Sequence, residues 1–255
     1  MARLTSLAQL RRFESVLSST EENYVRIKQL LFVGGTENTE LAERLMGCSD
    51  MIKACNSLAC KVCNRAFRLR TVDEIVLKMR RDKIKWWSVT LIDYSRAFEH
   101  SELQHFDLRK SKDRLRKLLK RSGFHGPIFG SIEIDFHESC QLWQPHFHLI
   151  MPISEQNTWA KEVLSKKLKR LQPNHIKSGL IARPYKFSPI RKPYTQVSYV
   201  YKLAFFGVKD WKCNFSGKPL TRKTRLDAKT FCDSLRWMDK QGRRAVLFSY
   251  DEKGW

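Results

Sequence analysis

Two histidines separated by one residue, His146 and His148, are the side chains of this sequence best suited to chemistry. They open the segment His146–Met151, a short apolar run between two prolines, which predicts a strand. Because side chains alternate faces along a strand, both imidazoles would point the same way while Phe147 points into the core. Two imidazoles on one rigid face can hold a divalent metal, although a pair of half-exposed surface histidines has the same pattern.

A second strand is predicted before the histidines, and it carries carboxylates. In Pro127–Phe136 apolar and polar residues alternate at the C-terminal end, so Glu133 and Asp135 share a face. If the polar connection that follows is a symmetric hairpin, Glu133 lies opposite His148 and Asp135 lies opposite His146. A register shift of two residues keeps these side chains on one face, whereas a shift of one separates them. Glu133 is therefore the expected third metal ligand, with Asp135 as the alternative.

The ligand types and the composition together narrow the choice of metal and partner. Two imidazoles and one carboxylate with open positions suit Mg²⁺ or Mn²⁺, and they also suit non-haem Fe(II). The chain has 48 Lys and Arg residues against 26 Asp and Glu, a formal net charge of +22. Such a charge favours nucleic acid as the partner and disfavours an oxygenase of small metabolites. The charge is spread widely along the chain, with basic helical stretches at Lys110–Arg121 and Lys161–Arg170 and basic loops at Arg183–Lys192 and Lys218–Arg225.

Four of the seven cysteines lie close together in the sequence: Cys48, Cys55, Cys60 and Cys63. Cys60 and Cys63 form a C-x₂-C pair, whose thiolates can reach one tetrahedral Zn²⁺ from a tight turn. Cys48 and Cys55 would complete a structural zinc site, and a set of reduced, buried cysteines is the alternative. The segment that follows, Arg65–Arg70, is expected to contact phosphates.

A tyrosine and a lysine form the third candidate functional motif, after the histidine–carboxylate set and the clustered cysteines. The segment Pro193–Gly207 predicts a helix that ends at its glycine, and Tyr199 and Lys202 stand three residues apart on it, on one face. A free phenol has a pKa of about 10 and is a poor nucleophile, but a neighbouring ammonium group or a metal at the target phosphate makes its attack feasible. A tyrosine packed in the core is the alternative reading, and Tyr201 is the better candidate for packing.

These elements occur in a familiar order. The chain resembles the HUH endonucleases, and among them the rolling-circle replication initiators of small bacterial plasmids. The resemblance runs from residue 55 to residue 207 and rests on a cysteine motif, a first strand motif, a metal-binding hairpin and a Y-x-x-K nucleophile motif. These are Cys55–Arg65, Trp87–Leu91, Ile132–Ile134 with Gln144–His148, and Ser198–Lys202.

The resemblance implies a mechanism and partners. His146, His148 and Glu133 would bind one Mg²⁺ or Mn²⁺, which polarises the scissile phosphate of single-stranded or hairpin DNA at a replication origin. Tyr199 would attack that phosphorus, forming a 5′-phosphotyrosine and a free 3′-hydroxyl that primes a polymerase, while Lys202 neutralises charge. A host helicase and polymerase are the expected protein partners, and no membrane is involved.

One departure from the family pattern concerns how the reaction ends. Related initiators often carry a glutamate one turn before the nucleophile, and here that position is Thr195, while the position of a second tyrosine nucleophile is Leu203. Two other functions stay open: an HUH transposase or relaxase, and a non-catalytic zinc-containing protein that binds nucleic acid.

The expected fold class is α+β, an antiparallel sheet covered by helices, with a small N-terminal helical and zinc-binding region. We expect a helical region at 1–45, a cysteine-rich zinc module at 46–82, the nuclease domain at 83–210 and an accessory region at 211–255. Strands are predicted at 83–93, 127–136, 146–151, 180–187 and 245–250, and helices at 110–121, 158–171, 194–206 and 225–240. The first 32 residues predict amphipathic helices that break near Ser18–Thr20 and end at Gly34. No signal peptide or membrane span is evident, so a cytoplasmic protein is expected.

Overall fold

The computed structural model describes residues 5–50, 52–171, 183–212 and 219–251. The chain forms two compact units, each assembled from separate stretches of sequence. Unit 1 comprises Met1–Lys83, Arg191–Leu203 and Asp227–Val246, and unit 2 comprises Ile84–Ile190, Ala204–Leu226 and Leu247–Trp255. The segment 191–203, which the sequence analysis places in the nuclease domain, therefore belongs to the unit that also holds the four clustered cysteines.

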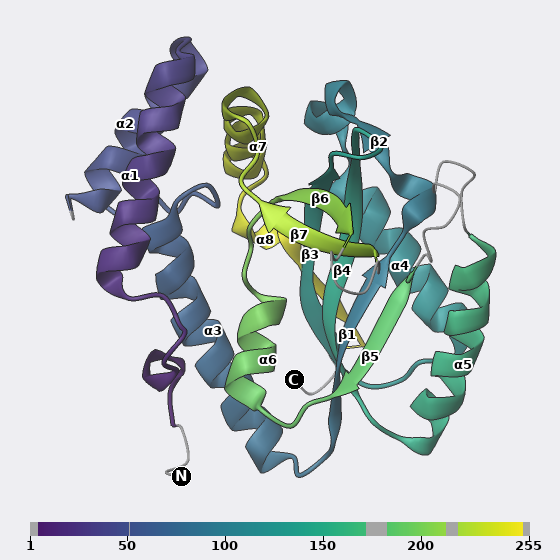
Figure 1. Cartoon of the computed structure of the whole chain (residues 1–255). Helices are drawn as coiled ribbons and strands as arrows, with labels where there is room; N and C mark the ends of the chain where they lie inside the picture. Colours follow the sequence, from purple (N-terminus) through teal and green to yellow (C-terminus); the bar gives the residue numbers. More distant parts are fainter. Residues whose placement is uncertain (1–4, 51, 172–182, 213–218, 252–255) are drawn as a thin grey trace. The chain divides into compact units, whose positions relative to one another are not determined.

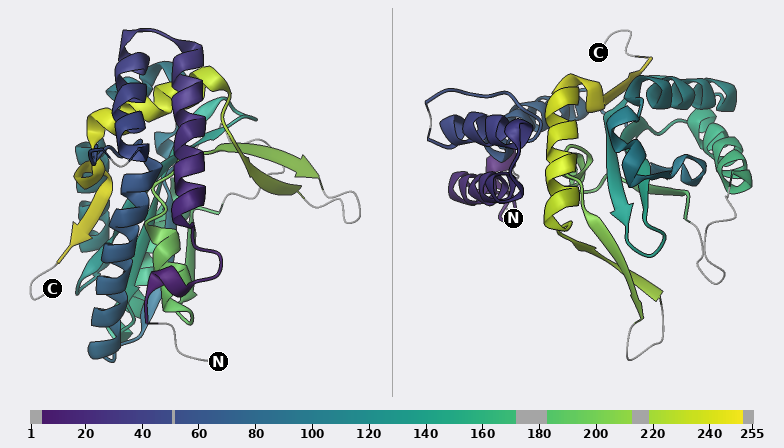
Figure 2. Two further views of the ribbon diagram at one scale, coloured as in Figure 1. Left: turned by 90° about the vertical axis from the view of Figure 1, so that its left-hand side faces the viewer. Right: turned by 90° about the horizontal axis from the view of Figure 1, so that it is seen from above.

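Unit 1 is helical. A short 3₁₀ helix precedes α1, and α1 and α2 lie side by side (Figure 2). Apolar side chains between the helices form the core of this unit, among them Ile27 and Leu30 from α1, Leu45 from α2 and Val76 from α3. The helices are η1 (Leu7–Gln9), α1 (Val16–Val33), α2 (Thr36–Ser49), α3 (Lys61–Arg81), α6 (Pro193–Val200), α7 (Ala228–Gln241) and α8 (Arg243–Val246).

The start of α1 corrects one prediction. The break expected near Ser18–Thr20 is wrong, because α1 begins at Val16 and runs through these residues. Ser15 is its N-cap, and the Ser15 side chain accepts a hydrogen bond from the backbone N–H of Ser18. The serines therefore start the helix and do not interrupt it. The predicted end is confirmed, since Gly34 terminates α1 with a φ of 72°.

Unit 2 contains an eight-stranded sheet with the strand order β5-β1-β4-β3-β6-β7, in which β2 also pairs with β4 and β8 with β3 (Figure 1). Among the described strands, every pairing is antiparallel except that of β3 with β6. The strand predicted at 180–187 begins at Tyr185, and residues 180–182 lie outside the described part of the chain. The strands are β1 (Trp86–Ile92), β2 (Phe98–Glu99), β3 (Ile128–His137), β4 (Leu142–Pro152), β5 (Tyr185–Pro189), β6 (Gly207–Lys212), β7 (Pro219–Thr224) and β8 (Leu247–Tyr250).

Two helices, α4 (Leu108–Ser122) and α5 (Glu155–Arg170), cover one face of this sheet (Figures 1 and 2). Local signals set their bounds: Asp107 and Ser154 accept hydrogen bonds from backbone N–H groups at the two N-termini, and Gly123 ends α4 in the left-handed conformation. Two 3₁₀ helices, Tyr94–Arg96 and His100–His105, lie between β1 and α4. The molecule is therefore a mixed fold of helices and a largely antiparallel sheet. No helix among the described residues combines the length and the apolar character needed to cross a membrane.

Gly130 allows β3 and β4 to approach each other closely. A Cβ atom at this position would lie 2.0 Å from the carbonyl oxygen of His148, a backbone atom that cannot move without shifting β4. We expect Gly130→Ala to destabilise the protein by about 3 kcal/mol, because the new atom overpacks the centre of the sheet. Gly47→Ala is the matched control, since nothing lies within 4 Å of its Cβ position in α2. That change should be neutral or stabilising by up to about 1 kcal/mol. Urea denaturation followed by circular dichroism measures both, and equal effects would contradict this account.

Candidate active site

The β3–β4 pairing places the candidate metal ligands on one face of the sheet. Glu133 pairs with His146, and Ser131 pairs with His148. The predicted register is wrong by two residues, because the connecting loop is only residues 138–141, with Gln141 at a φ of 58° and His137 already paired to Leu142. A shift of two preserves the alternation of faces, so Glu133 and both histidines still share one face.

The three side chains converge on a common point. The Nε2 atom of His148 lies 3.3 Å from Oε2 of Glu133, and Nε2 of His146 lies 3.6 Å from the same oxygen. One ligand atom from each residue can be chosen so that all three lie within 4.8 Å of one another. A cation bound at about 2.1 Å holds two ligands at right angles about 3.0 Å apart, so small movements would close the triad on one ion. These residues could therefore bind a metal.

Hydrogen bonds to the far ring nitrogens orient both histidines. Nδ1 of His146 lies 3.3 Å from the carbonyl oxygen of Gln144, and Nδ1 of His148 lies 3.1 Å from Oγ1 of Thr90 on β1. A carbonyl oxygen can only accept, so this contact favours a proton on Nδ1 of His146, which leaves Nε2, on the side of Glu133, as the nitrogen that could bind a metal. Partners of this kind, placed behind the ligand, fix ring orientation in metal sites. Sequence reasoning missed Thr90, which the β1–β4 register brings opposite His148.

Burial makes the charge of this cluster costly without a counter-ion. Glu133 is 0% exposed, His148 2% and His146 7%. Withdrawing a carboxylate from water is unfavourable unless a nearby positive charge compensates. Burial also lowers the pKa of His137 on the same face; Asp135 opposes this shift and His146 adds to it. His137 is therefore neutral near pH 7 and supplies no compensating charge.

Asp135, the alternative carboxylate, is held by other groups. Its Oδ2 atom lies 3.6 Å from Nε2 of His146, but the same oxygen accepts a 2.6 Å hydrogen bond from Nζ of Lys223 on β7. Its Oδ1 atom accepts the backbone N–H of Phe206 at 3.1 Å. A carboxylate already paired with an ammonium group is a weaker metal ligand than Glu133. The pairing of Lys223 with Asp135 could not be predicted from the basic segment Lys218–Arg225, because the approach of this lysine depends on the pairing of β6 with β3 and of β7 with β6.

The four clustered cysteines come together in unit 1. Cys48 lies in α2, Cys60 is the N-cap of α3, Cys63 lies in its first turn and Cys55 precedes it. The Sγ atom of Cys63 lies 3.4 Å from that of Cys48 and 3.8 Å from that of Cys55, and the Cys60–Cys48 distance is 3.5 Å. In a tetrahedral zinc site with bonds of about 2.3 Å, neighbouring sulfurs are about 3.8 Å apart. The cluster could thus hold Zn²⁺, and hydrogen bonds from Cys55 and Cys60 keep the pKa of Cys63 well below its usual range.

The tyrosine helix is shorter than predicted. The helix α6 ends at Val200, and Leu203 adopts a positive φ of 48°, so the predicted continuation to Gly207 is wrong. Lys202 lies beyond the helix, yet its Nζ atom is 4.7 Å from the centre of the Tyr199 ring. Tyr199 is 48% exposed, whereas Tyr201 is 4% exposed and packs edge-on against an aromatic ring of α3. Of these two phenols, Tyr199 is the accessible one.

A buried arginine supports the backbone next to Tyr199. Arg68 of α3 donates from Nη2 to the hydroxyl of Ser198 at 2.7 Å and to its carbonyl at 3.2 Å. Its Nη1 atom donates to Glu14 at 2.7 Å. The neighbouring Arg65 donates from Nε to the Glu14 carbonyl. The expectation that the segment Arg65–Arg70 contacts phosphates stays a prediction. Both guanidinium groups connect α3 to Glu14, and that of Arg68 also connects it to Ser198. Sequence reasoning missed the role of Arg68.

The residues singled out from the sequence fall into two sets. Tyr199, Lys202 and the cysteine cluster belong to unit 1, and the Glu133–His146–His148 triad belongs to unit 2. Comparison of the chain with models of protein families, with curated proteins and with solved structures finds no match. The functional assignment therefore rests on the residues themselves.

Glu133→Gln should weaken Mn²⁺ binding at least about tenfold, because an amide oxygen lacks the charge that the cation requires. Asp135→Asn is the matched control, and we expect it to change the affinity much less, since Lys223 already holds that carboxylate. Isothermal titration with Mn²⁺ measures both constants, and circular dichroism checks that each variant folds. An equal or larger loss in Asp135→Asn would show that Asp135 is the ligand.

The purified protein should contain one zinc ion per chain by mass spectrometry of the metal. Cys60→Ser should lose it and melt at a lower temperature, because zinc bound to a preformed cluster stabilises the folded state by several kcal/mol. Cys140→Ser, which changes a half-buried cysteine outside the cluster, is the control and should keep the metal. Zinc retained in full by Cys60→Ser would contradict the assignment.

Proposed function

We propose that this protein is a metal-dependent DNA strand-nicking enzyme of the HUH type, acting as an initiator of rolling-circle replication. The observation that carries the proposal is the triad of Glu133, His146 and His148 on one strand pair, with ligand atoms within 4.8 Å of one another. A two-histidine, one-carboxylate set built on adjacent strands is rigid and leaves coordination positions open for substrate oxygens. The bound divalent cation would polarise a phosphate and stabilise the charge that develops on it.

Tyr199 supplies the nucleophile in this proposal. Its hydroxyl oxygen forms a bond to phosphorus while the bond from phosphorus to the 3′-oxygen breaks, which leaves a 5′-phosphotyrosine and a 3′-hydroxyl. The proton released by the phenol balances the one taken up by the departing oxygen. Lys202 lies beside the ring, where its positive charge favours the phenolate that attacks. Exposure of Tyr199 and burial of Tyr201 support the choice between them.

The charge of the chain supports DNA as the substrate. A net charge of +22 gives strong, salt-dependent attraction to a phosphate backbone. Attack by a tyrosine on a phosphodiester uses no external cofactor besides the divalent metal, so a single-stranded DNA segment is sufficient for the first step.

We do not expect the phosphotyrosine to be hydrolysed by water that an acid beside Tyr199 activates. Thr195, one turn before Tyr199, is exposed but carries no acid. The neighbouring Gln196 is occupied at the start of α6, where its Oε1 atom accepts the backbone N–H groups of Arg191 and Lys192 at 2.8 and 2.9 Å. We therefore expect the covalent adduct to persist until a 3′-hydroxyl reverses the transfer.

Tyr199→Phe should abolish the covalent adduct with labelled single-stranded DNA in Mn²⁺, because the attacking oxygen is gone, and should leave DNA binding intact. Tyr201→Phe is the matched control and should form the adduct at the rate of the unaltered protein. Denaturing electrophoresis of a mixture of origin-length strands detects the product. If Tyr199→Phe forms the adduct, or if Tyr201→Phe alone loses it, Tyr199 is not the nucleophile. If the unaltered protein forms no adduct with any strand, the enzymatic proposal is overturned and a DNA-binding protein is favoured.

A further inference from the structure

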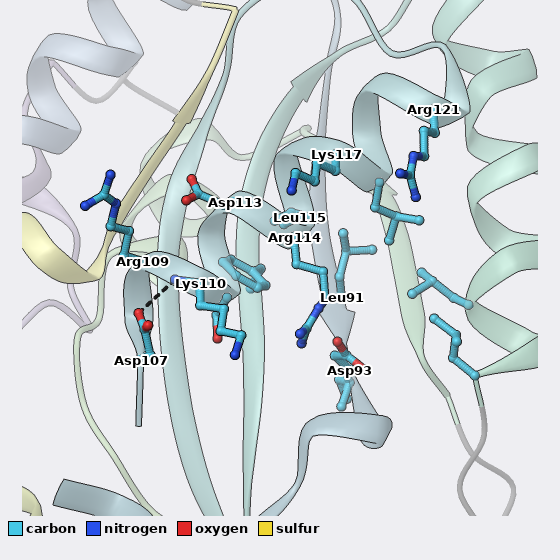
Figure 3. Close-up of a pocket in the computed structure, with 16 residues that line it drawn as sticks. Leu91, Asp93, Asp107, Arg109, Lys110, Asp113, Arg114, Leu115, Lys117 and Arg121 are labelled. Carbon is cyan, nitrogen blue, oxygen red and sulfur yellow. Dashed lines mark hydrogen bonds between the residues drawn. The ribbon is translucent and has the colours of Figure 1, made fainter. Parts of the chain in front are cut away.

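A groove lies on the face of the unit 2 sheet opposite to the metal triad. Phe147, between the two histidines of β4, points away from them and forms part of its floor together with Leu91 of β1. The helix α4 and the C-terminal end of α5, at Leu168, form its walls. The cavity has a volume of about 600 Å³, which is in the range of ligand sites (Figure 3).

Four cations form a row on the α4 wall. Lys110, Arg114, Lys117 and Arg121 follow one another at intervals of four, three and four residues, so they fall on one stripe of the helix and line the groove. At about 1.5 Å per residue, the row is about 16 Å long. Figure 3 shows these side chains on the side of α4 that borders the cavity.

The row differs from other cations of α4 in the contacts that its side chains make within the described part of the chain. Across residues 5–50, 52–171, 183–212 and 219–251, none of the four side chains forms an ion pair. Other cations of α4 are used: Arg116 pairs with Asp113 at 2.8 Å, and Lys112 donates to the carbonyl of Leu247. The acid at the start of α4, Asp107, caps the helix.

We propose that this groove binds single-stranded DNA, at a site separate from the metal triad. Four like charges held on one stripe repel one another, and a linear polyanion offsets that repulsion along the whole row, whereas a single phosphate covers only part of it. The apolar lining, in which the exposed Leu171 lies with the buried Leu91 and Phe147, suits the bases of an unpaired strand. A duplex keeps its bases stacked inside and would use the cations alone.

The proposal adds a second strand-binding site to the function proposed above and does not depend on the nuclease chemistry. Its test measures binding without cleavage, with no Mg²⁺ or Mn²⁺ added and no chelator that could remove zinc from the cysteine cluster, so that loss of the nuclease reaction and loss of this site are separate results. Fluorescence anisotropy of a labelled 20-nucleotide oligothymidylate, titrated at several salt concentrations, reports both affinity and the number of phosphates contacted.

The double variant Lys110→Gln with Lys117→Gln removes two charges from the row. Binding should weaken about tenfold near 0.15 M salt, and the slope of log affinity against log salt should fall by about 1.4, since each phosphate contact to a single strand contributes about 0.7. Lys120→Gln with Lys166→Gln is the matched control, because it removes two equally exposed lysines that do not line the groove. The control should keep the slope of the unaltered protein.

Three results would overturn the proposal. The groove variant and the control could lose affinity equally, which would mean that only total charge matters. The groove variant could bind as the unaltered protein does. A duplex or an oligouridylate could show the loss while the single-stranded DNA does not, which would assign the groove to that nucleic acid. Circular dichroism of both variants establishes that they fold, so a negative result counts against the groove.

Discussion

The antiparallel pairing of β3 with β4 is the constraint on which the arrangement of the candidate metal ligands in unit 2 depends. Because side chains alternate between the two faces of the sheet, the register of this pairing places Glu133, His146 and His148 on one face and Phe147 on the other. The close approach at Gly130 keeps the two backbones together where His148 lies. The metal triad and the apolar floor of the α4 groove are thus two sides of the same ladder, and neither can change register without the other.

Much of this arrangement could be predicted from local sequence. Alternation of polar and apolar residues, helical periodicity and capping residues predict the strands β1, β3 and β4 and the helices α4 and α5. The cysteine spacing predicts the cluster in unit 1. The register was wrong by two residues because the loop at 138–141 turns through Gln141 at a positive φ, a conformation that its sequence does not signal. The end of α6 was missed for a similar reason, since Leu203 takes the conformation usually given to glycine.

What the sequence could not supply is the set of long-range partners. Arg68 reaches Ser198 across 130 positions, and Lys223 reaches Asp135 across 88. Each contact exists only after a helix or hairpin from elsewhere in the chain has docked, so no local pattern encodes it. Each of these contacts orients a residue next to a candidate site residue, so the orienting residues of this protein are harder to predict from sequence than the candidate site residues themselves.

The division of the chain into interleaved segments has a consequence for how the molecule is made. Each unit consists of three separate stretches, and β8, which completes the pairing of β3, lies at 247–250. During synthesis, β3 cannot pair with β8 until residues 247–250 have been made. In the same way, unit 1 cannot be completed until α7 has been made. Non-local pairing of this kind slows folding and lengthens the time that apolar strand surfaces stay uncovered. Neither unit can be cut out as one continuous piece of the gene.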